Sequence, residues 1–182
     1  MVLNEHLSWA DVGNIPTSSG KVQDAFQLIF GEPTKELLPV GMLLYKFNGF
    51  NTLGRRDIND DTDLSPWWSP TLEFKHDAGL IQRIKIAQSN GVSFREWGRL
   101  TSVIKEDWSS MSWLLTIELK VPVYGWFGGF KGMSRIDDVT KSRRDTVVEA
   151  KGQSKNLPGG GTQFYIPNLK VQHLKSYSFR PI

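Results

Sequence analysis

Alternating apolar and polar positions mark the second half of the chain and predict β-strands there. The clearest strand covers residues 113–124, and Pro122 near its end favours an edge position or a bulge. Its predicted apolar face carries Trp113, Leu115, Ile117, Leu119, Val121 and Val123. Residues 163–171 and 173–179 also alternate, and residues 42–47 are apolar on both faces, as in a central strand.

Helical spacing is found in fewer places. Ser93 and Glu96 form a capping-box pattern that predicts a helix start. An apolar stripe at spacings of three and four follows, at Phe94, Trp97, Thr101, Ile104 and Trp108. Residues 17–19 would cap a short helix over 21–30, whereas residues 77–87 fit a helix or a strand equally well. The pattern predicts an α+β fold with early helices and most strands in the second half.

Length and composition predict one domain over residues 1–182, with residues 1–18 as a loosely packed N-terminal lead-in. The chain has no cysteine, which excludes disulfides, thiolate metal sites and a cysteine nucleophile. Its three histidines have no metal-ligand spacing, so no metal is expected. No apolar run reaches the roughly 18 residues of a membrane span, and the N-terminus lacks a signal-peptide pattern. We therefore expect no membrane partner and a cytoplasmic location.

The net charge of +3 is well below that of a dedicated nucleic-acid binder. Basic residues gather in residues 141–155, which are either a solvated loop or a phosphate-contacting tract. Acidic residues gather in residues 57–63 and alternate as calcium ligands do. However, Thr62 stands where the calcium loop needs Gly, and Trp68 stands at the closing acid position. A solvated acidic loop is therefore predicted.

Two glycine-rich segments, residues 125–132 and 157–162, are predicted to be flexible loops. In the strand after the second one, Phe164 and Ile166 would face the core. Gln163 and Tyr165 would face the other way, which places an amide and a phenol beside the loop.

Trp67 and Trp68 lie between two prolines, in the segment from Ser65 to Pro70. Neighbouring strand residues point to opposite faces, so one indole would pack in the core while the other lines a cleft. The alternative is that both are packing residues. Together with Lys46 and Gln163, such a cleft would suit a planar ligand with polar edges.

Three segments resemble, in the same order, the dispersed motifs of ADP-ribosyltransferase-type domains, as found at the C-termini of bacterial polymorphic toxins. They are Tyr45-Lys46, Ser65-Pro66-Trp67-Trp68 and the run from Gly159 to Tyr165. The resemblance implies a β-rich split-sheet core with a few helices, and NAD as a substrate. It puts Lys46 in the place of the family's dinucleotide-binding Arg, and Gln163 in the place of its late catalytic acid. The remaining NAD-binding residues that it implies are Tyr45, Ser65, Trp67, Trp68 and Tyr165.

Two of these positions depart from the family pattern. Lys46 cannot hold a diphosphate with the two-pronged geometry of Arg. Gln163 can neither accept a proton nor carry the negative charge that stabilises a cationic ribose. Glu118 and Glu149 are acids that could help, and the sequence favours neither.

The resemblance implies an NAD-dependent ADP-ribosyltransferase, a toxin or effector domain that modifies a protein or an RNA and releases nicotinamide. A delivered toxin would act in the cytoplasm of a target cell and would have a cognate immunity protein. Two alternatives remain open. One is an NAD glycohydrolase of the same fold, and the other is a non-enzymatic, aromatic-rich binding module.

Overall fold

A computed structural model describes residues 2–29, 31–54, 57–135 and 155–182. It is a mixed α+β fold dominated by a seven-stranded antiparallel sheet, as the α+β prediction required. The strand order is β3-β7-β8-β5-β4-β6-β9. In that order the strands are β3 (Thr34–Leu38), β7 (Val123–Ser134), β8 (Asn156–Tyr165), β5 (Trp67–Pro70), β4 (Leu43–Asn48), β6 (Trp113–Leu119) and β9 (Leu174–Pro181).

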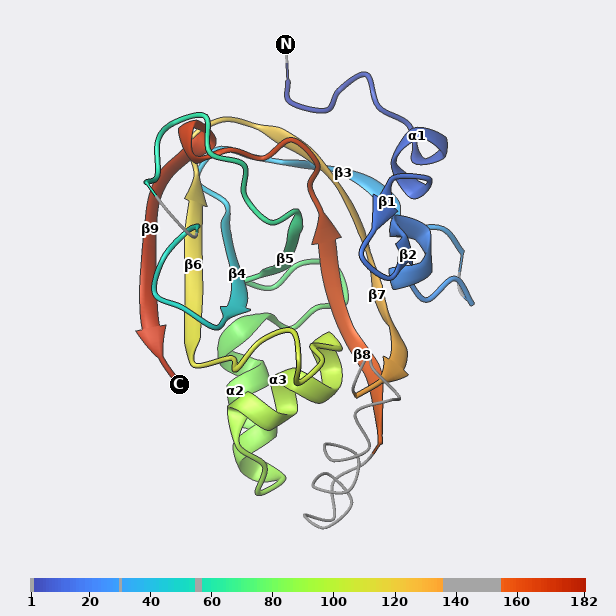
Figure 1. Cartoon of the computed structure of the whole chain (residues 1–182), viewed down its shortest axis with the longest axis vertical. Helices are drawn as coiled ribbons and strands as arrows, with labels where there is room; N and C mark the ends of the chain where they lie inside the picture. Colours follow the sequence, from blue (N-terminus) through green and yellow to red (C-terminus); the bar gives the residue numbers. More distant parts are fainter. Residues whose placement is uncertain (1, 30, 55–56, 136–154) are drawn as a thin grey trace.

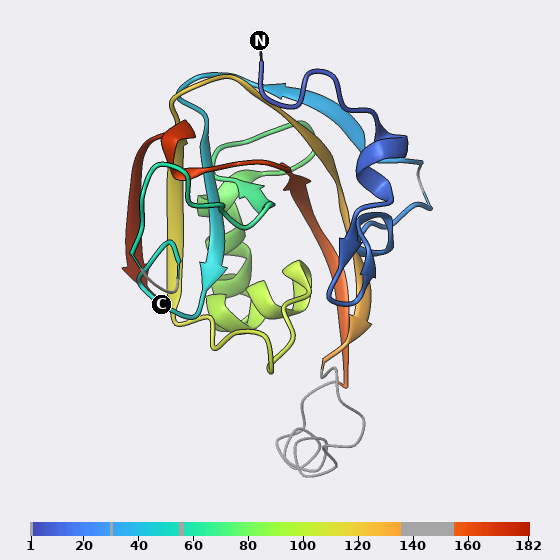
Figure 2. The ribbon, with the colours of Figure 1, turned by 45° about the horizontal axis from the view of Figure 1, so that its top comes forward.

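The short strand β5 joins two halves of this sheet. Strands β4, β6 and β9 stand on one side, and β8, β7 and β3 on the other (Figures 1 and 2). Helices α2 (Gly79–Ser89) and α3 (Phe94–Ser102) lie between the two halves at one end of the molecule. The core therefore forms where the halves face each other, around Leu44, Trp68, Ile117 and Phe164.

Helix α3 begins where the capping pattern predicted, because Ser93 Oγ accepts a hydrogen bond of 3.1 Å from the Glu96 N–H. It ends earlier than the apolar stripe, since Val103 takes a left-handed conformation with φ of 52°. Ile104 and Trp108 therefore lie in the loop that follows. Residues 77–87, which fitted either element, are mostly helix α2.

The helix predicted over residues 21–30 is wrong. A short hairpin of β1 (Pro16–Thr17) and β2 (Gly20–Lys21) leads into a single 3₁₀ turn, η1 (Val22–Ala25). Phe26 is then extended and bridges to Phe130 of β7, so tertiary pairing overrides the local helical pattern.

The first residues pack more closely than expected. Helix α1 (Trp9–Gly13) buries Val12 completely. Asn4 is also buried and donates hydrogen bonds to the carbonyl oxygens of Tyr124 (3.0 Å) and Pro167 (2.7 Å). The lead-in is thus tied to strand β7 and to the segment after β8.

The strand predicted over residues 113–124 is two strands, β6 and β7, with Pro122 in the turn between them. The strand predicted over 163–171 ends at Tyr165, and the 3₁₀ turn η2 (Val171–His173) precedes β9. The described part of the chain contains no helix long and apolar enough to cross a membrane.

Both glycine-rich segments are strand rather than loop, in β7 and β8. Gly128 pairs with Gln163, and Gly129 pairs with Thr162. Glycine is a local sequence signal for a loop. Here, hydrogen bonds to the neighbouring strands keep both segments extended despite that signal. Residues 136–154, which include most of the basic tract and Glu149, lie outside the described residues.

Candidate functional site

A cavity of about 840 Å³ opens between strands β4, β5 and β8 and the loop that follows α3. Small-molecule sites typically measure about 300–1,000 Å³, so the cavity can hold a ligand of nucleotide size. The hairpin turn at Ser18 and Ser19 forms another part of the wall.

Of the catalytic and NAD-binding residues that the resemblance implied, all except Tyr165 line this cavity. The cavity residues among them are Tyr45, Lys46, Ser65, Trp67, Trp68 and Gln163. They come from three segments that are far apart in the chain, and antiparallel pairing of β4 with β5 and of β5 with β8 brings them together.

Tyr165 lies in a neighbouring apolar cluster rather than in the cavity wall. Its ring centroid is 4.6 Å from that of Trp67, and the other buried residues of the cluster are Val12, Val22, Phe26 and Trp126. Burial raises the pKa of the Tyr165 phenol. Alternation along the strand predicted that the Tyr165 side chain would lie beside Gln163 on an open face. In the structure, the N-terminal segment covers the Tyr165 side chain.

The two neighbouring tryptophans have different environments. Trp68 is almost fully buried, and its Nε1 donates a 2.6 Å hydrogen bond to the Ser65 carbonyl. Trp67 is half-buried and packs against Phe26 at a centroid distance of 5.8 Å. One indole therefore belongs to the core, as predicted, yet both contribute to the cavity wall.

Lys46 places its Nζ 5.7 Å from the ring centroid of Trp68. Desolvation in this position lowers the pKa of Lys46 to about 8. An anionic ligand in the cavity would favour the charged ammonium, because an opposite charge offsets the cost of burial. The lysine is therefore a candidate anion-binding group.

Gln163 is buried, and its Nε2 donates a 3.2 Å hydrogen bond to the carbonyl of Ala25. This contact fixes the amide against the N-terminal segment and uses one of its two donors. The arrangement suits an orienting role toward a polar ligand.

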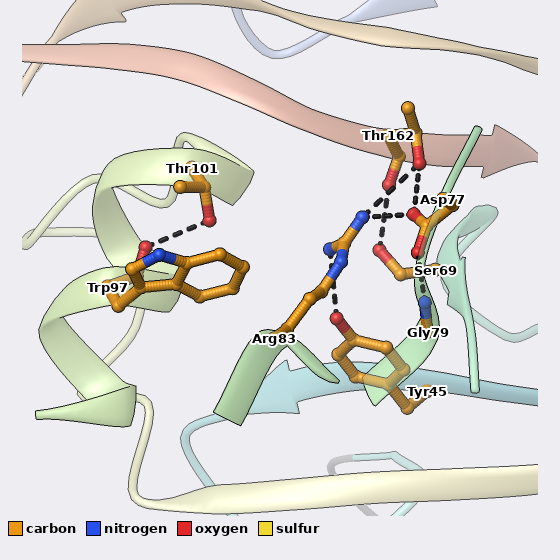
Figure 3. A network of polar contacts seen from close by, with 8 residues as sticks. All are labelled: Tyr45, Ser69, Asp77, Gly79, Arg83, Trp97, Thr101 and Thr162. Carbon is orange, nitrogen blue, oxygen red and sulfur yellow. Dashed lines mark hydrogen bonds and ion pairs between the residues drawn. The ribbon is translucent and has the colours of Figure 1, made fainter. Parts of the chain in front are cut away.

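A buried polar network lies beside the cavity and was not foreseen (Figure 3). Arg83 of α2 is at its centre. Its guanidinium donates to the Tyr45 hydroxyl (2.9 Å) and to Thr162 Oγ1 (3.2 Å), and forms an ion pair with Asp77. Asp77 also accepts a hydrogen bond from Thr162, while Ser69 Oγ donates to the Thr162 carbonyl (3.0 Å).

The network residues are sequence neighbours of the cavity residues. Tyr45 precedes Lys46, Ser69 follows Trp68, and Thr162 precedes Gln163. Tyr45 and Ser69 also line the cavity, so the network holds three strands together at the cavity wall. The only sequence signal for it was an Arg within the apolar run of residues 77–87.

The two acids that the sequence offered do not line the cavity in the described structure. Glu118 accepts hydrogen bonds from Lys175 (2.7 Å) and Ser176 (3.0 Å), and the bond from Lys175 is the largest cause of its lowered pKa. Glu149 lies outside the described residues. Two other acids, Glu106 and Asp107 in the loop after α3, do line the cavity.

The described residues contain no cluster of three or more His, Asp or Glu side chains that could hold a metal ion. Comparisons with protein families, with curated proteins and with solved structures found no match. The fold and the site thus define a mixed α+β protein, built mainly on an antiparallel sheet, with an aromatic cavity that contains one desolvated lysine and one buried glutamine.

Proposed function

We propose that the cavity binds NAD and that the protein is an NAD-dependent ADP-ribosyltransferase, a toxin or effector domain that modifies a protein or an RNA. The observation that carries this proposal is the meeting of three dispersed sequence motifs at one cavity. Lys46, the Ser65–Trp68 segment and Gln163 all line it. The two sheet halves on either side of the helices support an ADP-ribosyltransferase-like split sheet.

The cavity residues fit the chemical parts of NAD. Indole faces stack on planar rings, so Trp67 and Trp68 suit the nicotinamide, with Ser65 beside them. The Lys46 ammonium suits the diphosphate. Ser102 Oγ is buried in the wall and has no hydrogen-bond partner among the described residues, so a polar ligand would satisfy it.

In the proposed reaction, nicotinamide leaves with the electron pair of the glycosidic bond, and the acceptor nucleophile attacks the ribose C1′. Gln163 binds the ribose hydroxyls and orients the sugar. It does not move a proton, because a carboxamide is neither a base nor an acid in this pH range. An effector with this activity would act inside a target cell and would need a cognate immunity protein in its producer.

Gln163→Ala is expected to lower the rate of nicotinamide release about tenfold to hundredfold, the value of one or two hydrogen bonds to a polar ligand. The measurement is a nicotinamide-release assay with an acceptor-containing extract. Gln172→Ala is the matched control, since Gln172 is exposed and outside the cavity wall. Gln163→Ala should unfold at a somewhat lower urea concentration than Gln172→Ala, because it removes the hydrogen bond to the Ala25 carbonyl, and urea unfolding checks that both are folded in the assay.

Two results would redirect this proposal. If nicotinamide release were undiminished without a macromolecular acceptor, the protein would be an NAD glycohydrolase. No NAD binding at millimolar concentration would leave an aromatic binding module, in which the Trp67 and Trp68 rings stack on sugars or bases.

NAD affinity should fall as the pH rises through about 8, because Lys46 then loses its proton. Binding of the dianionic diphosphate stabilises the ammonium and raises the pKa of Lys46, so NAD binding should take up protons near pH 8–9. Calorimetry in two buffers of different ionisation heat measures this uptake. Lys46→Arg should bind NAD without proton uptake, since Arg stays charged. Equal wild-type affinity at pH 7 and pH 9.5 would contradict the role of Lys46.

A further inference from the structure

Glu106 is a charged cavity residue with no role in the reaction described so far. It lies in the loop between α3 and β6 and lines the same cavity as Lys46 and Gln163. Its backbone N–H donates a 3.1 Å hydrogen bond to the carbonyl of Arg135, at the end of β7. The loop is thereby tied to the sheet half that carries Gln163.

The carboxylate of Glu106 is held by a buried cation. Arg135 is 1% exposed, and its guanidinium lies 3.3 Å from Glu106 Oε1 and 2.9 Å from Glu96 Oε1. The Glu106 side chain itself is 33% exposed, so a ligand in the cavity can reach it. Arg135 thus fixes one orientation of a carboxylate that stays accessible.

We infer that Glu106 provides the negative charge that Gln163 lacks in the proposed transfer. This inference rests on the proposed function. As the bond between C1′ and the nicotinamide nitrogen breaks, its electron pair leaves with nicotinamide and C1′ becomes cationic. A carboxylate held in advance at the cavity wall lowers the energy of that state. When the acceptor bonds to C1′, its proton passes to the Glu106 carboxylate and then to solvent.

The chain contains a matched control for this inference. Glu96 and Glu106 share Arg135 and have similar exposure, with side chains 30% and 33% exposed. Of these two acids, Glu106 lines the cavity and Glu96 does not. A structural role that acts through Arg135 predicts equal effects of Glu96→Gln and Glu106→Gln, whereas a role in the reaction predicts an effect of Glu106→Gln alone.

The experiment measures nicotinamide release and NAD affinity for the wild type, Glu106→Gln and Glu96→Gln. Glu106→Gln should lower kcat about hundredfold with little change in NAD affinity, and Glu96→Gln should keep kcat within about threefold. Equal losses in both variants, or a normal kcat in Glu106→Gln, would overturn the inference and leave the proposed function standing. A wild type that releases no nicotinamide would overturn both.

A second variant keeps the test decisive if Glu106→Gln folds poorly. In Glu106→Ala, added formate should restore part of the turnover by placing a small carboxylate in the vacated space. Formate should not restore turnover in Gln163→Ala, where an orienting amide is missing. Failure of formate to raise the turnover of a folded Glu106→Ala would also overturn the inference.

Discussion

Asp77→Ala is expected to lower the free energy of unfolding by about 3–5 kcal/mol, since it would leave the Arg83 guanidinium buried without its carboxylate. Asp77 and Arg83 are 3% and 5% exposed, so water cannot replace the lost partner. Asp77 also accepts hydrogen bonds from Thr162 and from the Gly79 N–H (2.8 Å), which the substitution removes as well. Urea unfolding followed by tryptophan fluorescence measures the change.

The exposed ion pair between Lys75 and Glu36 is the control for this prediction. Glu36→Ala should cost about 1 kcal/mol or less, as surface pairs usually do. The double variant Asp77→Ala/Arg83→Met should recover part of the loss, because it removes the uncompensated charge. Equal losses in Asp77→Ala and Glu36→Ala would mean that the Arg83 network contributes nothing beyond a surface pair.

The same substitution should also disturb the cavity. Tyr45, Ser69 and Thr162 of the network are direct neighbours of Lys46, Trp68 and Gln163 in the chain. A network that loosens would therefore displace all three cavity segments together. Tyr45 and Ser69 also line the cavity themselves, so the network and the cavity are coupled both through the backbone and through residues that they share.

Local sequence patterns were sufficient to predict those elements whose structure depends least on contacts with distant parts of the chain. The run that is apolar on both faces became β4, which lies between β5 and β6 in the sheet. The Ser93 cap set the start of α3. Phe164 and Ile166 are both fully buried, as strand alternation required.

The Arg83 network could not be predicted in the same way. Arg83 bonds to Tyr45 across 38 residues and to Thr162 across 79 residues. An Arg in an apolar run usually lies at the surface, and only the tertiary fold shows which buried oxygens surround it. Likewise, Glu106 had no motif around it, and its place at the cavity depends on where the loop after α3 meets β7.

The three glycines before Gln163 were interpreted as a flexible loop, but they form a bulge within β8. Gly129 pairs with Thr162 while Lys131 pairs with Gly159, so Gly160 and Gly161 together lie opposite Phe130. A bulge inserts one residue and reverses the alternation of side chains beyond it. The bulge therefore decides which face of the sheet Gln163 occupies.

Gly159→Ala is expected to lower the free energy of unfolding by about 2–5 kcal/mol. Gly159 has a φ of 79°, where an L-residue costs about 1–2 kcal/mol. A Cβ there would also lie 2.5 Å from the carbonyl oxygen of Phe130, which is backbone and cannot move aside without breaking the β7–β8 pairing. Urea unfolding measures the loss, and the affinity for NAD, the ligand proposed above, reports whether the Gln163 amide is displaced.

Gly160→Ala separates the two causes within the same bulge. Gly160 has a φ of 96°, but a Cβ there would meet no described atom within 4 Å. Its cost should therefore be backbone strain alone, about 1–2 kcal/mol, with ligand binding preserved. If Gly159→Ala proves no more destabilising than Gly160→Ala, the close approach of β7 to Gly159 is not what shapes the bulge. In that case Gln163 must owe its orientation to the Ala25 contact instead.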